Sequence, residues 1–522
     1  MYLTHITQYL EATVAAHPDR VAVHDGDASI TFEHLYERVL AVAASLSRRL
    51  GGRTGLVVAA HLPKSLDAVV ADLAILYSGN AYMNLDVKSP AQRLANILEQ
   101  TRPALIVAGA ASPLPPEFGP AWEMPRELPA PDDKERRAVL ALRDSCIDTD
   151  LLCIINTSGS TGTPKAVALN HHSFIDFTEV VCEAGLVREG EVVASLSPAV
   201  FDIFSFELCM LMARGATLAL VPESCAAFPV RLLELMAALR VTFLFWVPTI
   251  MVNIANMDLL AHIPLPDLRM AWFAGEVFPT AKFNYWRARL PHVTFANFYG
   301  PIEITLDCLY HVVERDLRDD EPIPIGKPFR NTAILVLNDE NKPVLPGQPG
   351  VEGELCVRGS SLAAGYYNNP EKTAAAFVQN PLNSAYPERI YRTGDVVAWN
   401  EHGELVFKGR KDTLIKHLGY RIELAEIEHV AVNTLKIAPN CCALYDQARK
   451  RIVLVCEAAS PLSEKALRQK LGEVLPKYMV PSLSLSIPEM PRNRNGKIDR
   501  QFLKEHLDEL LSGAEKAARD SV

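Results

Sequence analysis

The sequence lacks the features that mark several large classes of protein. No run of 18 uninterrupted apolar residues occurs, so no membrane-spanning helix and no membrane partner are expected. The N-terminal segment MYLTHITQYLEATVAAHPDR has no basic flank before a long apolar run, so it predicts an amphipathic helix rather than a secretory signal. We therefore expect a cytoplasmic location.

Charge, cysteine and histidine exclude further classes. The 52 basic and 62 acidic residues leave a net charge of −10, which argues against a nucleic-acid binder. The ten cysteines form no CxxC pair, and only Cys441 and Cys442 are adjacent, so reduced thiols are favoured over a disulfide framework. His171 and His172 have no suitably spaced third ligand, which favours a helix start over a metal site.

What is present is an alternation of two patterns. The chain has 522 residues, which is too long for a single hydrophobic core, and 49% of them are hydrophobic. Short apolar runs alternate with helix-length patterns such as 65–79 and 229–240, and these runs occur at 54–62, 104–110, 151–158, 191–198, 216–222 and 241–248. The alternation predicts an α/β fold with parallel sheets covered on both faces. Hairpin patterns begin near residue 323, and a smaller unit of mixed strands and helices begins near residue 413.

The most informative stretch is NTSGSTGTPKAV, residues 156–167, which follows an apolar strand. Glycines let backbone N–H groups approach an anion, hydroxyls add donors, and Lys165 adds positive charge. It is not a Walker P-loop, because Pro164 stands where that motif needs a glycine before the lysine. We favour phosphate binding over an ordinary surface loop, with the candidate residues Thr157, Ser158, Gly159, Ser160, Thr161 and Gly162.

At this point a family resemblance is plain. SGSTGTPK resembles the signature of the adenylate-forming (ANL) superfamily, which contains acyl-CoA synthetases, luciferases and the adenylation domains of nonribosomal peptide synthetases. The resemblance extends over about residues 6–505. Its other segments follow in the family's order: ITFEHLYERV, GNAYMNLDVKSPAQRL, FDIF, NFYGPIE, GELCVRG, YRTGDVV, GRKDTLIKHLGYRIELAEIE, LPKYMVP and NGKIDR.

The resemblance implies a domain organisation. A large N-terminal adenylation core, residues 1–410, is expected to hold layered parallel sheets and, within 323–410, a distorted β-barrel. A small mobile α+β lid, residues 411–522, is expected to rotate between two half-reactions about a hinge near Asp412. No GGxS attachment site for phosphopantetheine appears, and the chain ends soon after NGKIDR. We therefore expect a stand-alone enzyme that loads the phosphopantetheine of a separate carrier protein.

The resemblance also implies nucleotide-binding roles. ATP and Mg²⁺ are expected, with Glu303 as the metal-binding and catalytic carboxylate and Lys165 on the outer phosphates. Lys497 in NGKIDR matches the main catalytic lysine. The remaining nucleotide contacts are expected from Asn297, Tyr299, Gly300, Asp395, Phe407 and Arg410, with Tyr299 stacking on adenine and Asp395 accepting from the ribose hydroxyls.

One departure affects this set, because Ile302 stands where the family usually has a threonine whose hydroxyl contacts the α-phosphate. A charge-assisted bond worth roughly 1.5–3 kcal/mol is then missing. Slow or compensated adenylation follows from it, and a catalytically weak nucleotide-binding member of the family is one alternative reading.

Asp202 in FDIF bears on the substrate. In amino-acid-activating members an aspartate here pairs with the substrate ammonium, whereas acyl-CoA synthetases generally lack it. A helix-start aspartate is the plainer reading. The pocket carried over from the family consists of Ile203, Phe206, Phe245, Trp272, Ala274, Phe298, Leu306 and Asp307. Its bulky rings predict a small α- or β-amino acid, activated for secondary-metabolite (antibiotic) biosynthesis. Asp307 pairs either with a second polar or cationic substrate group or with protein atoms. An acyl-CoA synthetase-type ligase remains the other alternative.

Overall fold

The computed structural model describes residues 3–109, 114, 116–118, 121–158, 164–411, 414–458, 462–492 and 498–512. The chain forms two compact units. The first comprises 1–87, 101–155 and 166–411, and the second comprises 88–100, 156–165 and 412–522. The predicted division into 1–410 and 411–522 assigns each domain one continuous range, whereas the structure groups segments 88–100 and 156–165 with the C-terminal residues. The predicted boundary therefore stays a prediction. Neither unit contains, within its described residues, a helix long and apolar enough to cross a membrane.

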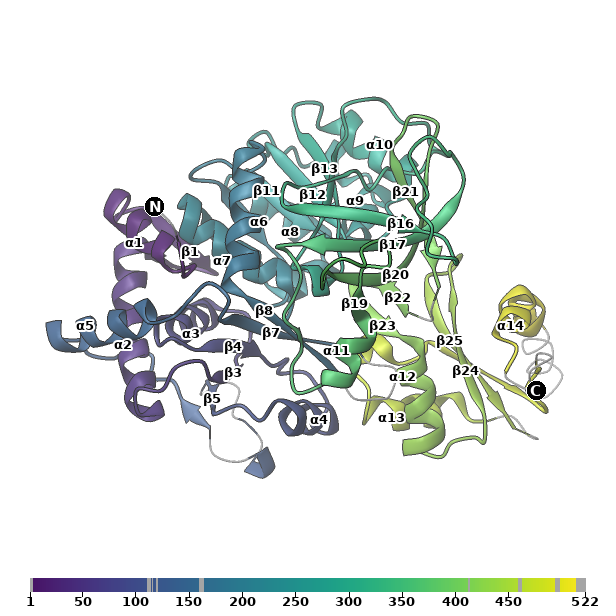
Figure 1. Cartoon of the computed structure of the whole chain (residues 1–522), viewed down its shortest axis with the longest axis horizontal. Helices are drawn as coiled ribbons and strands as arrows, with labels where there is room; N and C mark the ends of the chain where they lie inside the picture. Colours follow the sequence, from purple (N-terminus) through teal and green to yellow (C-terminus); the bar gives the residue numbers. More distant parts are fainter. Residues whose placement is uncertain are drawn as a thin grey trace. The chain divides into compact units, whose positions relative to one another are not determined.

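The larger sheet of the first unit has nine strands in the order β15-β14-β13-β12-β11-β9-β10-β1-β2. Figure 1 shows its neighbouring strands β11, β12 and β13. The pairs from β13 through β1 are parallel, and β2, β14 and β15 add antiparallel edges. In sheet order the strands are Lys327–Pro328, Leu309–Val312, Thr294–Tyr299, Met270–Ala274, Phe243–Trp246, Val192–Ser195, Thr217–Leu220, Val21–Asp25 and Ala28–Thr31.

A second sheet of seven strands has the order β18-β8-β7-β4-β3-β5-β6. Its strands are Gly365–Tyr366, Lys165–Asn170, Leu151–Thr157, Ala81–Asn84, Val57–His61, Leu105–Ala108 and Trp122–Glu123. Strand β4 pairs in parallel with β3, β3 with β5, and β5 with β6. The apolar runs of the sequence therefore form parallel strands, and the predicted α/β fold class is confirmed.

Helices cover both faces of the nine-stranded sheet. Within β11 and β12, residues Phe243, Phe245 and Trp272 face one core, whereas Leu244 and Phe273 face a second. Burial on both faces explains why these strands are continuous apolar runs. The helices of this unit are α1 Gln8–Ala16, α2 Phe32–Leu50, α3 Leu66–Tyr77, α5 Asp133–Asp144, α6 His171–Glu183, α7 Asp202–Arg214, α8 Pro229–Ala238, α9 Pro248–Asn256, α10 Thr280–Arg289 and α11 Pro370–Ala376.

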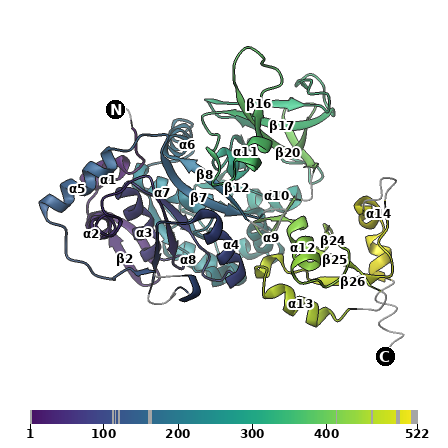
Figure 2. The same cartoon turned by 60° about the horizontal axis from the view of Figure 1, so that its bottom comes forward.

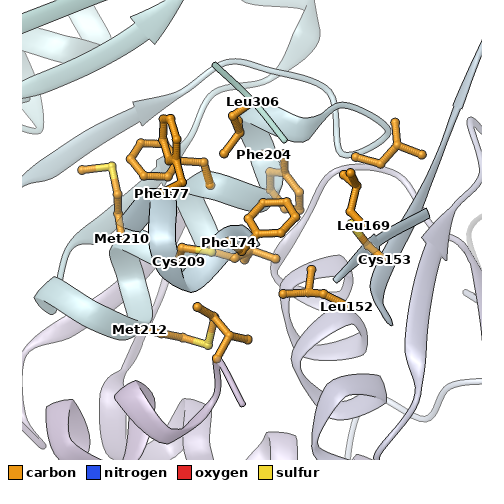
Figure 3. Packing of buried hydrophobic residues seen from close by; sticks show 14 of the residues in the cluster. Leu152, Cys153, Leu169, Phe174, Phe177, Phe204, Cys209, Met210, Met212 and Leu306 are labelled. Atoms are coloured by element: carbon orange, nitrogen blue, oxygen red, sulfur yellow. The ribbon is translucent and has the colours of Figure 1, made fainter. Parts of the chain in front are cut away.

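Helix α6 illustrates how these helices begin and pack. It starts at His171, and the Asn170 side chain caps it by accepting from the backbone N–H of Ser173. Phe174 and Phe177 of α6 then pack with Phe204 and Met210 of α7 (Figure 3). The helix start predicted for His171–His172 is confirmed. Among the described residues, no group of three or more His, Cys, Asp or Glu side chains could hold a metal ion.

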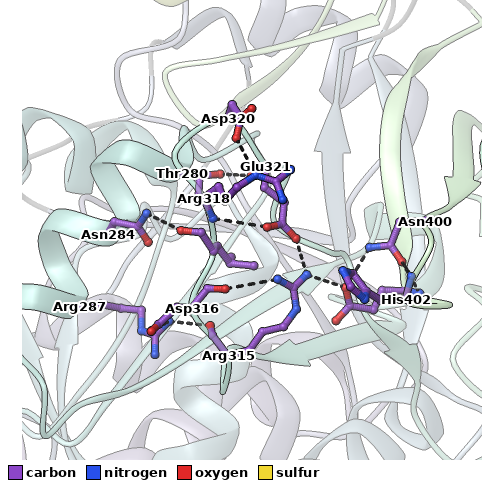
Figure 4. A network of polar contacts seen from close by, with 12 residues as sticks. Thr280, Asn284, Arg287, Arg315, Asp316, Arg318, Asp320, Glu321, Asn400 and His402 are labelled. Carbon is purple, nitrogen blue, oxygen red and sulfur yellow. Dashed lines mark hydrogen bonds and ion pairs between the residues drawn. The ribbon is translucent and has the colours of Figure 1, made fainter.

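A third sheet of the first unit is antiparallel, in the order β16-β17-β20-β19 with β21 paired to β20. The strands are Thr332–Leu337, Glu352–Gly359, Arg389–Trp399, Phe377–Gln379 and Leu405–Arg410. Arg315 ties the turn between β20 and β21 to the segment after β14, because it bonds both Glu321 and Glu404 (Figure 4). Arg287 of α10 donates to the Arg315 carbonyl at 2.6 Å. This network fixes the strand that carries Arg410.

The second unit has a sheet β24-β25-β26 (Cys441–Asp446, Arg451–Glu457, Leu483–Ile487) and a hairpin β22-β23 (Leu414–His417, Tyr420–Glu423). Its helices are α4 Ala91–Thr101, α12 Leu424–His429, α13 Glu464–Gly472 and α14 Arg500–Glu505 (Figure 2). Buried Arg93 of α4 donates to buried Glu426 of α12 at 2.8 Å. This pair joins the 88–100 segment to the rest of the unit.

Candidate active site

The end of β7 carries the phosphate-loop candidates. Ser158 Oγ donates to the Arg421 carbonyl at 2.7 Å and accepts from the Glu423 backbone N–H at 3.0 Å. Lys165 Nζ pairs with the Glu423 carboxylate, and both side chains are largely buried. Thr157 Oγ1 is buried and has no hydrogen-bond partner among the described residues. The predicted residues Gly159, Ser160, Thr161 and Gly162 lie outside the described residues.

The residues predicted to bind the nucleoside meet around Asp395. Its carboxylate accepts from the Tyr299 hydroxyl on one oxygen and from Arg410 on the other. Strand register explains the second contact, because Asp395 of β20 lies opposite Arg410 of β21. Arg410 also donates to the Thr393 carbonyl at 3.0 Å. Burial, reinforced by Asp395, raises the pKa of Tyr299 well above its usual value, so the phenol keeps its proton. A carboxylate has about four lone-pair sites, so Asp395 retains acceptor capacity for a ligand.

Three other predicted nucleotide residues have local structural reasons for their positions. Asn297 is buried on β13 and donates from Nδ2 to the Pro324 carbonyl at 2.8 Å. Phe407 of β21 is partly buried against the large core. A Cβ on Gly300 would lie 2.2 Å from the Leu306 carbonyl oxygen, so this position admits only glycine. The backbone contact of Gly300 has no signal in the sequence, because the strand end and the 305–307 turn meet only in the fold.

Glu303 lies in a single 3₁₀ turn, Ile302–Ile304, and is fully buried. Its Oε1 accepts from the Tyr366 hydroxyl at 2.8 Å, and its carbonyl accepts from the Ala363 N–H at 2.9 Å. Mg²⁺ usually takes one or two carboxylates together with substrate phosphate and water. A single buried carboxylate held by a tyrosine therefore fits a magnesium ion that arrives with a nucleotide. Ile302 packs in the large core.

The predicted acid pocket is dominated by four aromatic rings. Trp272 stacks on Phe298 at a centroid distance of 4.1 Å and on Phe206 at 5.5 Å. Phe245 meets the Trp272 ring edge-on at 5.4 Å. All four side chains are at most 2% exposed. Register brings them together, because Phe245 pairs with Trp272 across β11 and β12, and Phe298 follows on β13. Ala274 and Leu306 belong to the same buried cluster, and Ile203 packs at its border.

Two acidic residues belong to this region. Asp202 is the first residue of α7 and is half-buried, a position at which a carboxylate is stabilised by the helix dipole. Asp307 is 4% exposed and follows two residues in the left-handed region, Thr305 and Leu306. Its charge contributes to raising the pKa of neighbouring Cys308, after burial. Thr305 Oγ1 is buried without a partner among the described residues.

A buried polar frame supports the loop that precedes Asp202, and sequence reasoning missed it. Asn84 Nδ2 donates to the Ala199 carbonyl at 3.0 Å and to Asp72 at 2.8 Å. Ser195 Oγ donates to Glu207 of α7 at 2.5 Å, and Tyr82 donates to Ser205 of α7 at 2.7 Å. Burial raises the pKa of Asp72 to about 8 and that of Glu207 to about 7.

Besides residues 159–162, the catalytic candidate Lys497 and the hinge candidate Asp412 lie outside the described residues. The roles assigned to the described site residues also stay predictions, although the structure gives their positions.

Comparisons with known proteins bear on this site. The sequence profile of the AMP-binding enzyme family matches residues 10–367. The chain is 32% identical over 519 residues to the L-proline–[L-prolyl-carrier protein] ligase of Streptomyces coelicolor. The aligned region covers 94% of this chain and 94% of the ligase. It belongs to the AMP-binding enzyme family. As a member of this family it is an adenylate-forming ligase of the nonribosomal-peptide-synthetase type, which activates amino acids.

Other relatives are longer or known as structures. The enzyme is 32% identical to the δ-poly-L-ornithine synthetase of Acinetobacter baumannii and 31% identical to tyrocidine synthase 3 of Brevibacillus parabrevis, and it spans only 35% and 8% of their lengths. Among solved structures, PA1221, which contains adenylation and carrier domains, matches at 25% identity with a TM-score of 0.80 over 96% of this chain and 84% of that one. IdnL1 matches at 25% identity with a TM-score of 0.79, over 94% and 100%.

Proposed function

We propose that this enzyme activates a small α- or β-amino acid in the cytoplasm and transfers it to the phosphopantetheine thiol of a separate carrier protein for secondary-metabolite biosynthesis. The observation that carries the proposal is the ring cluster beside α7. Four buried rings that the family resemblance assigns to the acid pocket pack together, and Asp202 begins α7, the helix that carries one of them, Phe206. A full-length match to a stand-alone carrier-protein ligase supports the carrier as acceptor.

Asp202 is assigned to the substrate ammonium. A cation leaving water needs an anionic partner, and the half-buried carboxylate supplies one. The four aromatic rings are assigned to limit the length of the substrate side chain. A β-amino acid or an α-amino acid with a short side chain satisfies both conditions. Asp307 is assigned to bind a second polar group of the substrate. Where the substrate has no such group, Asp307 bonds protein atoms instead.

The first half-reaction joins the substrate carboxylate to the α-phosphorus of ATP and releases pyrophosphate. Asp395 and Tyr299 are assigned to hold the ribose and adenine, and Lys165 the outer phosphates. Lys497 is assigned to the charge that develops between carboxylate and phosphate. Glu303 would hold Mg²⁺, which, when bound, neutralises phosphate charge. Tyr366 orients that carboxylate through its hydrogen bond.

The test is substrate-dependent pyrophosphate release with hydroxylamine trapping, across small α-amino, β-amino, diamino, aryl and fatty acids. One small amino acid should give a strong signal that Asp202→Ala and Lys497→Ala abolish. Asp133→Ala is a matched control, because Asp133 is also the first residue of a helix, α5, but is exposed and is not one of the predicted site residues. It should leave the signal unchanged.

Other outcomes would redirect the assignment. A signal only with acids that lack an amine would move the enzyme to the acyl-CoA synthetase branch. ATP binding without turnover across the whole panel would instead favour the catalytically weak nucleotide binder.

A further inference from the structure

Two cysteines face each other across the sheet of the second unit. Strand register pairs Cys441 of β24 directly with Cys456 of β25, and their sulfur atoms are 3.4 Å apart. Both side chains are buried, at 4% and 0% exposure. They are therefore a spatial pair, which the sequence does not reveal, since 15 positions separate them.

The pairing site has the geometry that a cross-strand disulfide needs. The Glu457 N–H donates to the Asn440 carbonyl at 2.9 Å, which makes the neighbouring residues a hydrogen-bonded pair. Hydrogen-bonded and non-hydrogen-bonded pairs alternate in an antiparallel ladder, so Cys441 and Cys456 form a non-hydrogen-bonded pair. Side chains approach most closely at such pairs, where the Cα atoms are about 4.5 Å apart. That separation lies within the range of disulfides, about 4.4–6.8 Å.

The position along the ladder provides access. Cys441 is the first residue of β24, which is an edge strand of the three-stranded sheet, and Cys456 is the last residue but one of β25. Strand ends open locally at a much lower free energy than a whole domain does, so a small oxidant reaches this pair without global unfolding. The hydrogen bond from Cys441 lowers the pKa of Cys456, which favours Cys456 as the thiol that reacts first.

We propose that Cys441 and Cys456 are an oxidative modification site, a dithiol that a peroxide converts to a cross-strand disulfide. The Cys456 thiolate attacks one peroxide oxygen, which breaks the O–O bond, releases water after protonation and leaves a sulfenic acid. The Cys441 sulfur then attacks the Cys456 sulfur, the S–O bond breaks, and a second water leaves. Two thiols and one peroxide thus give one disulfide and two waters.

The neighbouring cysteine is an internal control. Cys442 follows Cys441 in β24 and, by strand alternation, faces the opposite core. Cys441 and Cys456 pack in the core with Ile422 and Leu467, whereas Cys442 packs with Leu485 and Leu503. Cys442 is equally buried and adjacent in sequence, but it has no thiol opposite it, because its cross-strand partner is Val455.

The experiment treats the folded full chain with hydrogen peroxide, blocks the remaining thiols with N-ethylmaleimide, and maps the peptides. We expect one disulfide joining Cys441 to Cys456, reversed by dithiothreitol, and a higher melting temperature in the oxidised chain, because the cross-link constrains the unfolded state. Cys442→Ala should form the same disulfide. Cys441→Ala and Cys456→Ala should not form it.

Folding of the variants does not limit this test. The wild-type chain oxidised in urea should give several pairings, whereas the folded chain should give this one. Unmodified Cys441 and Cys456 in the oxidised folded chain, irreversible sulfonic acids without a disulfide, or a bond to Cys442 would each overturn the proposal.

Discussion

The two halves of the candidate site in the first unit are built on opposite principles. On the nucleotide side each charged group is held by another protein group: Asp395 by Tyr299 and Arg410, and Glu303 by Tyr366. On the acid side, rings in mutual contact fill the space, and the Trp272 indole N–H has no partner among the described residues. The nucleotide side is preorganised by hydrogen bonds and an ion pair, which fail when one partner is removed, whereas the acid side is shaped by the packing of bulky rings.

The largest effect should come from breaking the charge pairing. Arg410→Met removes one partner of the buried Asp395 carboxylate, and such a loss typically costs about 3–5 kcal/mol. We expect that fall in the free energy of unfolding of the first unit, measured by urea denaturation, and loss of ATP-dependent pyrophosphate release. Arg318→Met is the control, because its ion pair with Asp320 is exposed. A stable Arg410→Met chain would show that the carboxylate is not held by charge.

The next prediction tests whether the bulky rings of the predicted acid pocket limit the length of the substrate side chain. Trp272→Leu should cost roughly 3 kcal/mol of stability and shift the preferred acid toward longer side chains, because it opens space among the rings. Phe273→Leu, one residue along β12 and facing the other core, should destabilise the unit without altering acid preference. The readout is the ratio of kcat/KM for short and long amino acids. An unchanged ratio in Trp272→Leu would place the substrate side chain elsewhere.

Asn84 belongs to the buried polar frame that supports the loop before Asp202. Asn84→Ala leaves the Ala199 carbonyl and Asp72 without their donor, which typically costs about 1–3 kcal/mol. We expect a higher KM for the amino acid and an unchanged KM for ATP. Steady-state kinetics in both substrates provide the check, and equal rises in both KM values would count against a positioning role.

A pH dependence of stability should come from the same polar frame. The pKa of Asp72 is about 8 in the folded chain against 3.8 in an unperturbed aspartate, so between these values the folded state keeps a proton that the unfolded state releases. Its contribution is complete below pH 3.8 and is lost as pH rises toward 8, at about 1.4 kcal/mol per pH unit. Asp72→Asn should flatten this slope in urea denaturation between pH 5 and 8. An identical slope in both chains would contradict the assignment.

Much of the fold could be predicted from sequence because its signals are local. The apolar runs at 191–198 and 241–248 became the parallel strands β9 and β11, since a strand buried on both faces must be apolar throughout. The family motifs likewise indicated Tyr299, Asp395 and Arg410, and the fold brings these three side chains together. The same reasoning missed Asn84, Asp72 and Glu207, because a polar residue within an apolar run gives no sign of its distant partner.

The sequence by itself determined the fold class, the family and the candidate residues, because hydrophobic periodicity and the order of motifs are visible along the linear chain. Only the tertiary structure decided which residues meet. It set Gly300 against the Leu306 carbonyl, the four rings against one another, and Cys441 against Cys456. These contacts depend on strand register and on packing between elements far apart in the chain, which no local pattern encodes.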